Sequence, residues 1–340
     1  MNSSTQAEGF TDSGISVVIP LYNKESTVER AILSVLRQEG VEKEIIVIDD
    51  GSTDGSAERA KKFGDRIIYV RQTNQGPSMA RNHGASLSKF NRLVFLDADD
   101  ELMAGCLAAH VACRTANPDI EVSLVSFRVM AGKDVLREET LTERIKDMEV
   151  TNGVACLDSF ASGMVVNIAS GAICVNKTIF ERAGKFDSGL RCWEITDLMY
   201  RLALQGSKIG VLQNFYVTIH ESKSESHFQQ LRADPKYIVR FADRLLDHIS
   251  ELPENQKELI LEKVASLLGA LASARNARAF KRLAERACRY AAVANLSNGL
   301  CRLSRRSVAT IKFSFYFCHR KRQKAKQSGN NGRRAKKCAE

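Results

Sequence analysis

The chain has 340 residues, of which 44% are hydrophobic, so it is long enough for one large domain with an appendage or for two modest domains. Its 9 cysteines include no C-x-x-C pair, which argues against a disulfide framework and a zinc site and favours a reducing compartment. No apolar run is long enough to span a bilayer, and the polar N-terminus does not resemble a secretory signal. The net charge of +10 is uneven: residues 286–340 hold 15 Lys and Arg and one acid, so they carry +14 and residues 1–285 carry −4.

The first part of the chain alternates short apolar runs with helical patterns. Runs rich in β-branched residues predict strands over 15–20, 44–48, 66–70 and 93–96. Between them, apolar residues at helical spacing predict a helix from Val28 to Leu36, turn residues open a second helix over 56–63, and Pro77 opens a third. This alternation predicts an α/β fold with a doubly wound, mostly parallel sheet.

Acidic residues follow two of these predicted strands: Asp49 with Asp50, and Asp97 with Asp99 and Asp100. Because parallel strands end at one edge of a sheet, where ligands bind in open α/β folds, the two groups should converge on one crevice. The second group fits a site for Mg²⁺ or Mn²⁺ that holds a substrate phosphate, but it also fits a solvated acidic turn that caps a helix. Turn chemistry is the alternative for the first pair as well, and a surface ion pair is the alternative to phosphate binding for Arg81.

Four segments resemble, in order and spacing, the successive motifs of the family 2 glycosyltransferases. They are VVIPLYN at 17–23, IVIDDGSTD at 46–54, GPSMARN at 76–82 and FLDADD at 95–100, and the resemblance covers about residues 14–225. It implies a GT-A fold, a nucleotide-sugar donor, and transfer with inversion of the anomeric centre.

The resemblance also implies roles for individual residues. The nucleotide-sugar site would comprise Pro20, Tyr22, Asn23, Asp49, Asp50, Ser52, Arg81, Asp97 and Ala98. In this set Asp49 or Asp50 would accept a hydrogen bond from a uracil-like base, and Arg81 would meet the diphosphate. Asp99 and His220 would bind the metal ion, Mn²⁺ or Mg²⁺, which stabilises charge on the departing nucleoside diphosphate. A structural role is the alternative for His220.

The catalytic base departs from the family pattern. Residues 193–203 resemble a Glu-Asp-x-Asp-Leu-x-x-Arg-Leu stretch in which the Asp after the Glu is usually the general base, but Ile195 stands at that place. Glu194 could serve instead if it turned inward. Asp197 is a second candidate, although it lies one step round the helix and also fits a helix N-terminal acid. The third interpretation is an enzyme that is slow or inactive on ordinary acceptors.

Beyond the acid cluster the sequence predicts a helix over 102–116, a strand over 122–130 and a charged, exposed loop over 133–148. Residues 167–187 resemble the family's acceptor-side segment, in which a strand and a short helix precede a Gly-x-Phe-Asp turn. There Gly184 is expected to end the helix and Phe186 to be buried.

The C-terminal part has a different character. Two apolar stripes at helical spacing, one before and one after Pro253, predict a helical extension. The predicted domains are a disordered segment 1–13, a GT-A domain 14–228, the helical extension 229–295 and a basic, aromatic-containing tail 296–340. The aromatic residues of 313–317 beside the cations of 319–322 favour docking on an anionic membrane, and a disordered, solubilising tail is the alternative.

Together these observations predict a cytoplasmic, membrane-peripheral glycosyltransferase of bacterial surface-polysaccharide type. It would move a sugar from a nucleoside diphosphate, with UDP as the first choice, to a glycan or a lipid-linked acceptor. One alternative is a degenerate transferase that binds nucleotide without turnover, which Ile195 favours. Another is a nucleic-acid-binding protein that acts through its basic tail, but this does not explain an acidic crevice.

Overall fold

The computed structural model describes residues 14–141, 149–151, 154–157, 168–221, 234–273 and 276–293. The chain forms two compact units, which meet in the sequence between Phe241 and Ala242. No helix within the described ranges is both long and apolar enough to cross a membrane. The domain boundaries predicted from the sequence stay predictions, because 1–13, 222–233 and the tail from 294 lie outside the described residues.

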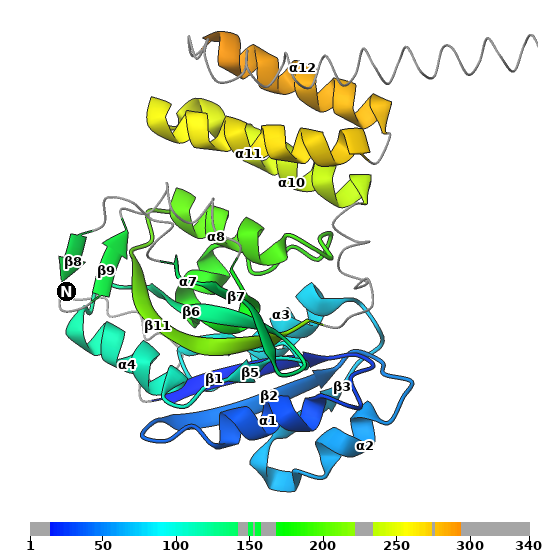
Figure 1. The fold of residues 1–340 in the computed structure, drawn as a ribbon, viewed down its shortest axis with the longest axis vertical. Coiled ribbons are helices and arrows are strands. Elements are labelled where there is room, and N and C mark those ends of the chain that lie inside the picture. Colours follow the sequence, from blue (N-terminus) through cyan, green and yellow to red (C-terminus); the bar gives the residue numbers. More distant parts are fainter. Residues whose placement is uncertain are drawn as a thin grey trace, which may run out of the picture. The chain divides into compact units, whose positions relative to one another are not determined.

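The first unit is built on one large sheet (Figure 1). Its parallel half has the order β3-β2-β1-β4, with β1 (Gly14–Leu21), β2 (Glu42–Asp49), β3 (Ile68–Arg71) and β4 (Arg92–Phe95). The register sets Leu21 of β1 beside Asp49 of β2, and Val18 beside Phe95 of β4. The loops that follow β1, β2 and β4 therefore leave from one edge of the sheet, as the sequence predicts.

The helices that connect the parallel strands are α1 (Val28–Leu36), α2 (Ser56–Lys61) and α3 (Pro77–Leu87). Figure 1 shows α1 and α2 on one side of the sheet and α7 (Lys177–Arg182) and α8 (Glu194–Leu204) on the other. Helix α3 contacts β1 and β2 closely at Gly84, where an added Cβ would lie 2.3 Å from a methyl carbon of Val18. Gly84, two residues beyond the GPSMARN segment, is therefore a packing glycine.

The second half of the sheet is mixed in direction. Short β10 (Ile173–Asn176) lies antiparallel between β4 and β6 (Val122–Ala131), and β6 pairs in parallel with the long β11 (Ile209–His220). The remaining elements are β5 (Glu101–Leu102), helix α4 (Cys106–Ala116), β8 (Glu149–Thr151) and β9 (Val154–Leu157). The predicted helix over 102–116 begins only at Cys106, because Leu102 pairs with Val217 of β11.

The prediction of a loop over 133–148 is wrong for the first part of that range. Residues Asp134–Glu139 form strand β7, which pairs antiparallel with β6 after a turn at Gly132. Gly132 has φ +63°, a left-handed conformation that glycine adopts without steric cost. Strand β7 is exposed over most of its length, so its charged composition resembles that of a loop. Residues 142–148 lie outside the described part of the chain.

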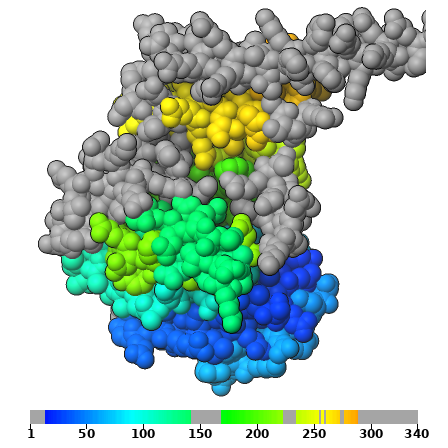
Figure 2. Space-filling view, in the orientation of Figure 1, coloured from blue at the N-terminus to red at the C-terminus, as the bar shows by residue number. Residues whose placement is uncertain are grey.

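An aromatic cluster supports the edge of the sheet at which the acids lie. Phe95 of β4 packs against Phe180 of α7 and Phe186, with ring centroids 5.3 and 4.9 Å away. Gly184 ends the α7 segment with φ +83°, and Phe186 is buried, as the sequence predicts. In Figure 2 the blue, cyan and green parts of the first unit join in one continuous surface.

The helical part consists of α10 (Pro235–Asp247), α11 (Glu254–Ser273) and α12 (Ala277–Val293). The predicted stripes are buried, namely Ile238, Phe241, Leu245, Ile249, Ile260, Val264, Leu267, Leu268 and Leu271. Inside the second unit, ion pairs of Arg282 and Arg286 with Asp243, and of Arg286 with Asp247, fasten α12 to the end of α10.

Candidate active site

Hydrogen bonds join the loops that follow β1 and β2. The Asn23 amide donates to Ser52 Oγ at 3.2 Å, and the Thr53 amide donates to Asn23 Oδ1 at 2.8 Å. Asn23 has φ +51°, a left-handed conformation that asparagine tolerates better than most residues. Beside it Tyr22 is 47% exposed, so its ring offers a face at the edge of the sheet. Pro20, by contrast, lies within β1 and is half-buried.

Asp49 and Asp50 are buried and bind the polypeptide itself. Asp49 accepts hydrogen bonds from the Ser52 amide at 2.8 Å and the Tyr69 hydroxyl at 2.6 Å. Burial, assisted by this carboxylate, raises the pKa of Tyr69 well above its ordinary value, so the phenol stays a donor.

Asp50 holds the loop that leads into α3. It accepts from the amides of Gln75 at 2.9 Å and Gly76 at 2.8 Å and from the side chain of Gln72 at 2.8 Å. Both acids after β2 therefore fix loop geometry, which was the alternative left open by the sequence.

Arg81 is a buried cation of the site, with 3% of its surface exposed. Its Nη2 donates to Asp97 Oδ1 at 2.6 Å and its Nη1 donates to Glu194 Oε1 at 3.0 Å. Burial opposes the charge of Arg81, but the two carboxylates outweigh it and raise the pKa of the guanidinium. Arg81 thus bridges the acid cluster to the start of α8, and both of its terminal nitrogens are already engaged with carboxylates.

The neighbouring acids carry a second set of cations. Lys24 forms an ion pair with Asp99 across partly exposed side chains, and Arg30 lies 3.2 Å from Glu101. Asp100 is buried, and this burial together with the charges of Asp97 and Asp99 raises its pKa well above the ordinary value. The raised pKa reflects how closely the carboxylates crowd together. Ala98, between the acids, is buried against the core.

His220 reaches this edge from the end of β11. Its amide donates to Asp100 Oδ1 at 3.2 Å, whereas its imidazole Nε2 meets Glu101 Oε1 at 2.6 Å. The structure therefore brings His220 to the acid cluster, but it pairs the side chain with Glu101 and not with Asp99.

The donor chemistry of this cluster fits a divalent ion. No group of three or more His, Cys, Asp and Glu is arranged as a metal site among the described residues. Asp97 and Asp99, however, offer carboxylate oxygens with about a third of each side chain exposed, and Lys24 is itself 42% exposed and can leave Asp99. Mg²⁺ commonly binds through one or two carboxylates together with substrate phosphates and waters. The residues present fit that mode of binding.

The two candidate bases have different surroundings. Glu194 is buried beside Arg81, and among the described residues no hydrogen bond or ion pair engages its Oε2. Asp197 is fully buried and accepts from Arg201 Nε at 2.9 Å and Nη2 at 2.8 Å, one turn along α8. Ile195 packs against the core. Glu194 is thus the candidate that lies next to the acid cluster.

The backbone before Glu194 is strained. Trp193 has φ +66°, which is uncommon for a bulky residue and marks a place where the surroundings determine the conformation. Its ring stacks on Phe241 with centroids 5.9 Å apart and planes 8° from parallel. This contact within the first unit fixes the direction in which Glu194 enters the site.

Sequence reasoning missed Lys24 and Arg30. Lys24 follows the first motif directly, but a single lysine fits a surface position equally well, and its pairing with a residue 75 positions later has no local signal. Arg30 lies on the first helix, where an arginine is ordinary.

Parts of the chain are similar in sequence to known glycosyltransferases. Residues 16–164 match the family model described as glycosyl transferase family 2. The chain is 40% identical over 94 residues to the glycosyltransferase GlyA of Streptococcus pneumoniae, which is 27% of this chain and 14% of that protein. It is 37% identical over 99 residues to a GalNAc(5)-diNAcBac-PP-undecaprenol beta-1,3-glucosyltransferase of Campylobacter jejuni, which is 28% of this chain and 32% of that protein. The matches therefore span a third or less of these relatives.

A solved structure shares the fold over a longer stretch. The S. aureus TarS 1–349 structure in complex with UDP-GlcNAc superposes with a TM-score of 0.58 at 15% identity and covers 84% of this chain and 91% of that one. At this identity the likeness shows a common fold.

Proposed function

We propose that this chain, which belongs to the family 2 glycosyltransferases and has a GT-A-type fold, transfers a sugar from a nucleoside diphosphate to a hydroxyl acceptor. The observation that carries the proposal is the Asp97–Arg81–Glu194 bridge. It sets a carboxylate suited to proton transfer beside the acids suited to a metal-bound diphosphate.

The donor is proposed to be a UDP-sugar bound at the edge formed by the loops after β1, β2 and β4. Exposed Tyr22 would stack on the base, and the loop of Asn23, Asp49, Asp50 and Ser52 would present hydrogen-bonding groups to it. The UDP-GlcNAc complex of TarS, which has the same fold, supports a uridine nucleotide. The sugar itself is left open by these residues.

The diphosphate is proposed to lie beside Asp97 and Asp99. A divalent ion, Mn²⁺ or Mg²⁺, bound there would neutralise charge that develops on the departing nucleoside diphosphate. Lys24 would move from Asp99 to a phosphate oxygen when the donor binds, because it is half-exposed and flexible. Arg81 would keep Asp97 and Glu194 in place. His220 would then be either a further metal ligand or, through Glu101, a support for the cluster.

Glu194 is the proposed general base. The acceptor oxygen would attack the anomeric carbon on the face opposite the diphosphate, the bond from that carbon to the phosphate oxygen would break, and the acceptor proton would pass to Glu194 Oε2. This course inverts the anomeric centre. Asp197, paired with Arg201 inside α8, is the weaker candidate.

The acceptor is proposed to be a glycan or a lipid-linked saccharide. The undecaprenol-linked substrate in the name of the Campylobacter jejuni relative supports this class. Docking of the basic tail on the inner face of an anionic membrane is proposed from composition alone, since residues 294–340 lie outside the described part of the chain.

The first experiment is a calorimetric titration of UDP with and without Mn²⁺ on the wild type and Asp99→Asn. Metal-dependent binding that weakens at least about tenfold in Asp99→Asn supports the donor site. Asp65→Asn, an exposed acid outside the site, is the matched control. The proposal fails if the wild type binds neither UDP nor any other nucleoside diphosphate.

The second experiment separates an active from a degenerate transferase. UDP release from a panel of UDP-sugars, with saccharide acceptors present, is measured for the wild type, Glu194→Gln and Asp197→Asn. A general base contributes about 10²–10⁴-fold, so Glu194→Gln should lose that factor in kcat while it still binds UDP. Binding without turnover in the wild type would support the degenerate alternative.

A further inference from the structure

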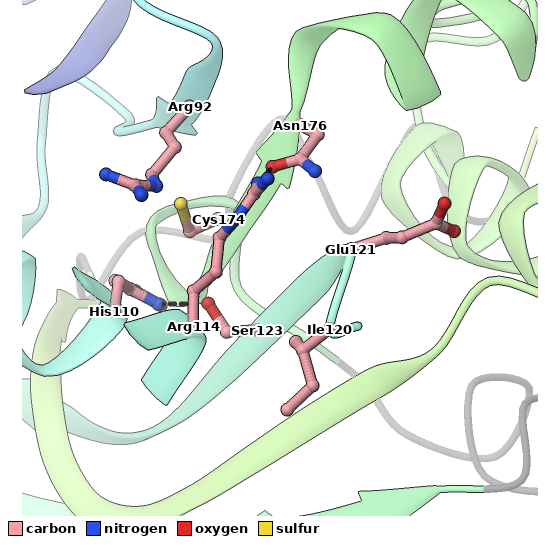
Figure 3. A pocket seen from close by; sticks show the side chains of 8 residues that line it. All are labelled: Arg92, His110, Arg114, Ile120, Glu121, Ser123, Cys174 and Asn176. Carbon is pink, nitrogen blue, oxygen red and sulfur yellow. Dashed lines mark hydrogen bonds between the residues drawn. The ribbon is translucent and has the colours of Figure 1, made fainter. Parts of the chain in front are cut away.

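A cationic pocket lies at the opposite end of β4 from the acid cluster. Arg92 begins this strand and Asp97 follows its end, so a rise of about 3.3 Å per residue separates them by roughly 16 Å. Figure 3 shows the pocket, to which β4, α4, β6 and β10 all contribute side chains. The enclosed space is small, and the pocket opens to solvent.

Arg92 is a buried cation in this pocket, with 9% of its surface exposed. Its Nε is buried without a hydrogen-bond partner, and no described residue forms an ion pair or a side-chain hydrogen bond with its guanidinium. A buried charge without a counter-charge is costly, and proteins rarely retain one unless something else neutralises it. Arg92 therefore points to an anion that binds from outside the polypeptide.

The neighbours of Arg92 do not supply that anion. Burial raises the pKa of the Cys174 thiol to about 12, so the sulfur stays protonated. Glu121 also lines the pocket, but its carboxylate points away from Arg92 in Figure 3 and lies 3.7 Å from Arg182. The acid among the residues that line the pocket is thus directed elsewhere.

Other groups add donors to the same space. Arg114 of α4 brings a second guanidinium, which Asn176 Oδ1 orients. His110 Nδ1 lies 2.8 Å from Ser123 Oγ, and its buried Nε2 has no hydrogen-bond partner. Two cations and an unused imidazole nitrogen therefore surround one small space, which fits the fork geometry by which arginine holds oxyanions.

We propose that this pocket is a second binding site, separate from the donor site, for a phosphate-class oxyanion held chiefly by Arg92. Arg114 contributes charge at the edge of the pocket. Ser123 and His110, which contact each other, form part of the wall of the pocket. The occupant is either free inorganic phosphate or the phosphate of a small phosphomonoester.

The test measures thermal unfolding and calorimetric binding of inorganic phosphate to the full chain, with sodium chloride at matched ionic strength as the reference. Phosphate should stabilise the wild type more than chloride does, because a ligand that binds only the folded state raises its stability. Arg92→Leu should weaken phosphate binding by at least about tenfold. Arg182→Gln, which removes one exposed cation next to Glu121, should retain the wild-type response.

The same variants separate binding from a structural role. Without phosphate, Arg92→Leu should be as stable as the wild type or more stable, because no internal partner is lost. A large loss of stability in phosphate-free buffer would instead overturn the proposal, as would an undiminished phosphate response. Arg114→Gln, whose side chain is only half-buried, should also weaken phosphate binding and should fold like the wild type.

Two further measurements define the site. UDP binding should be unchanged in Arg92→Leu, and loss of both ligands together would contradict a separate site. Glycerol 3-phosphate should compete with inorganic phosphate if the pocket takes the end of a larger molecule, and its failure to compete would assign the site to the free ion.

Discussion

Arg81 donates from Nη1 to Oε1 of Glu194 at 3.0 Å, although 113 residues separate the two in sequence. The contact joins the helix that follows β3 to the helix that carries the proposed base. Glu194 is thus held by a cation from a distant helix and not by Ile195, its neighbour in the chain.

Replacing Arg81 should destabilise the fold as well as the site. Arg81→Met leaves Glu194 buried without its partner, so the free energy of unfolding should fall by about 3 kcal/mol. Arg81→Lys should lower the free energy of unfolding by less, because lysine keeps the charge although it cannot reach both acids. Urea denaturation checks both values. Arg59→Met, at a half-exposed pair with Glu29, should change stability by less than about 1 kcal/mol. Equal effects of the Arg81 and Arg59 changes would contradict the bridge.

Removing the Lys24 ammonium group should raise the affinity of the site for a divalent ion. The ammonium group pairs with Asp99 and competes with a divalent ion for the same oxygens. Lys24→Met should therefore bind Mn²⁺ several-fold more tightly in the absence of nucleotide, as followed by electron paramagnetic resonance. It should bind UDP more weakly if the lysine meets a phosphate. Lys61→Met on α2 is the control, and an unchanged Mn²⁺ affinity in Lys24→Met would argue that the ion binds elsewhere.

Asp50 should be more important for stability than its place in a turn suggests. Its carboxylate accepts three hydrogen bonds, two of them from amides of the loop before α3. Asp50→Ala should lower the free energy of unfolding by about 3 kcal/mol, because buried donors lose a charged acceptor. Chemical denaturation gives the value, with exposed Asp65→Ala as reference. A loss of less than about 1 kcal/mol would mean that the loop finds other partners.

His110 should make stability depend on pH. Burial lowers its pKa to about 3 in the folded state, compared with about 6.5 when unfolded. The stability that neutral His110 contributes is therefore fully present above the unfolded pKa. It is lost as the pH falls from about 6.5 toward 3, at up to about 1.4 kcal/mol per pH unit.

The corresponding measurement is urea unfolding at pH 7.5 and pH 5.0. His110→Gln should show a smaller loss of stability between these two values than the wild type does. His248→Gln, at a partly exposed position of the second unit, serves as the reference variant. If His110→Gln retains the full wild-type loss, other groups cause the acid sensitivity.

The strand ends were predictable from the sequence because they have local signals. Pro20 marks the end of β1 to within one residue, and acids follow β2 and β4, so the edge of the sheet at which the acids lie could be predicted from the sequence. The fold class followed from the same alternation and is confirmed by the structure and its likeness to TarS.

What the sequence could not predict depends on contacts between distant residues. The edge strand β7 has the composition of a loop, and only its pairing with β6 makes it a strand. Likewise Arg81, Lys24 and His220 pair with Glu194, Asp99 and Glu101, each 75 or more positions away. The roles of Arg81 and His220 were taken from a resemblance that names residues but not their neighbours, and Lys24 was missed.

The hydrogen bonds of Asp50 have a consequence for the reaction. A helix N-terminus commonly attracts phosphate because its first amides are free, but the amides of Gln75 and Gly76 before α3 are already bound to a carboxylate. The positive end of α3 is thus neutralised from within the chain. At the proposed donor site, the charge of a diphosphate would be balanced by mobile side chains and the proposed ion, so affinity for nucleotides should respond steeply to ionic strength and to chelators.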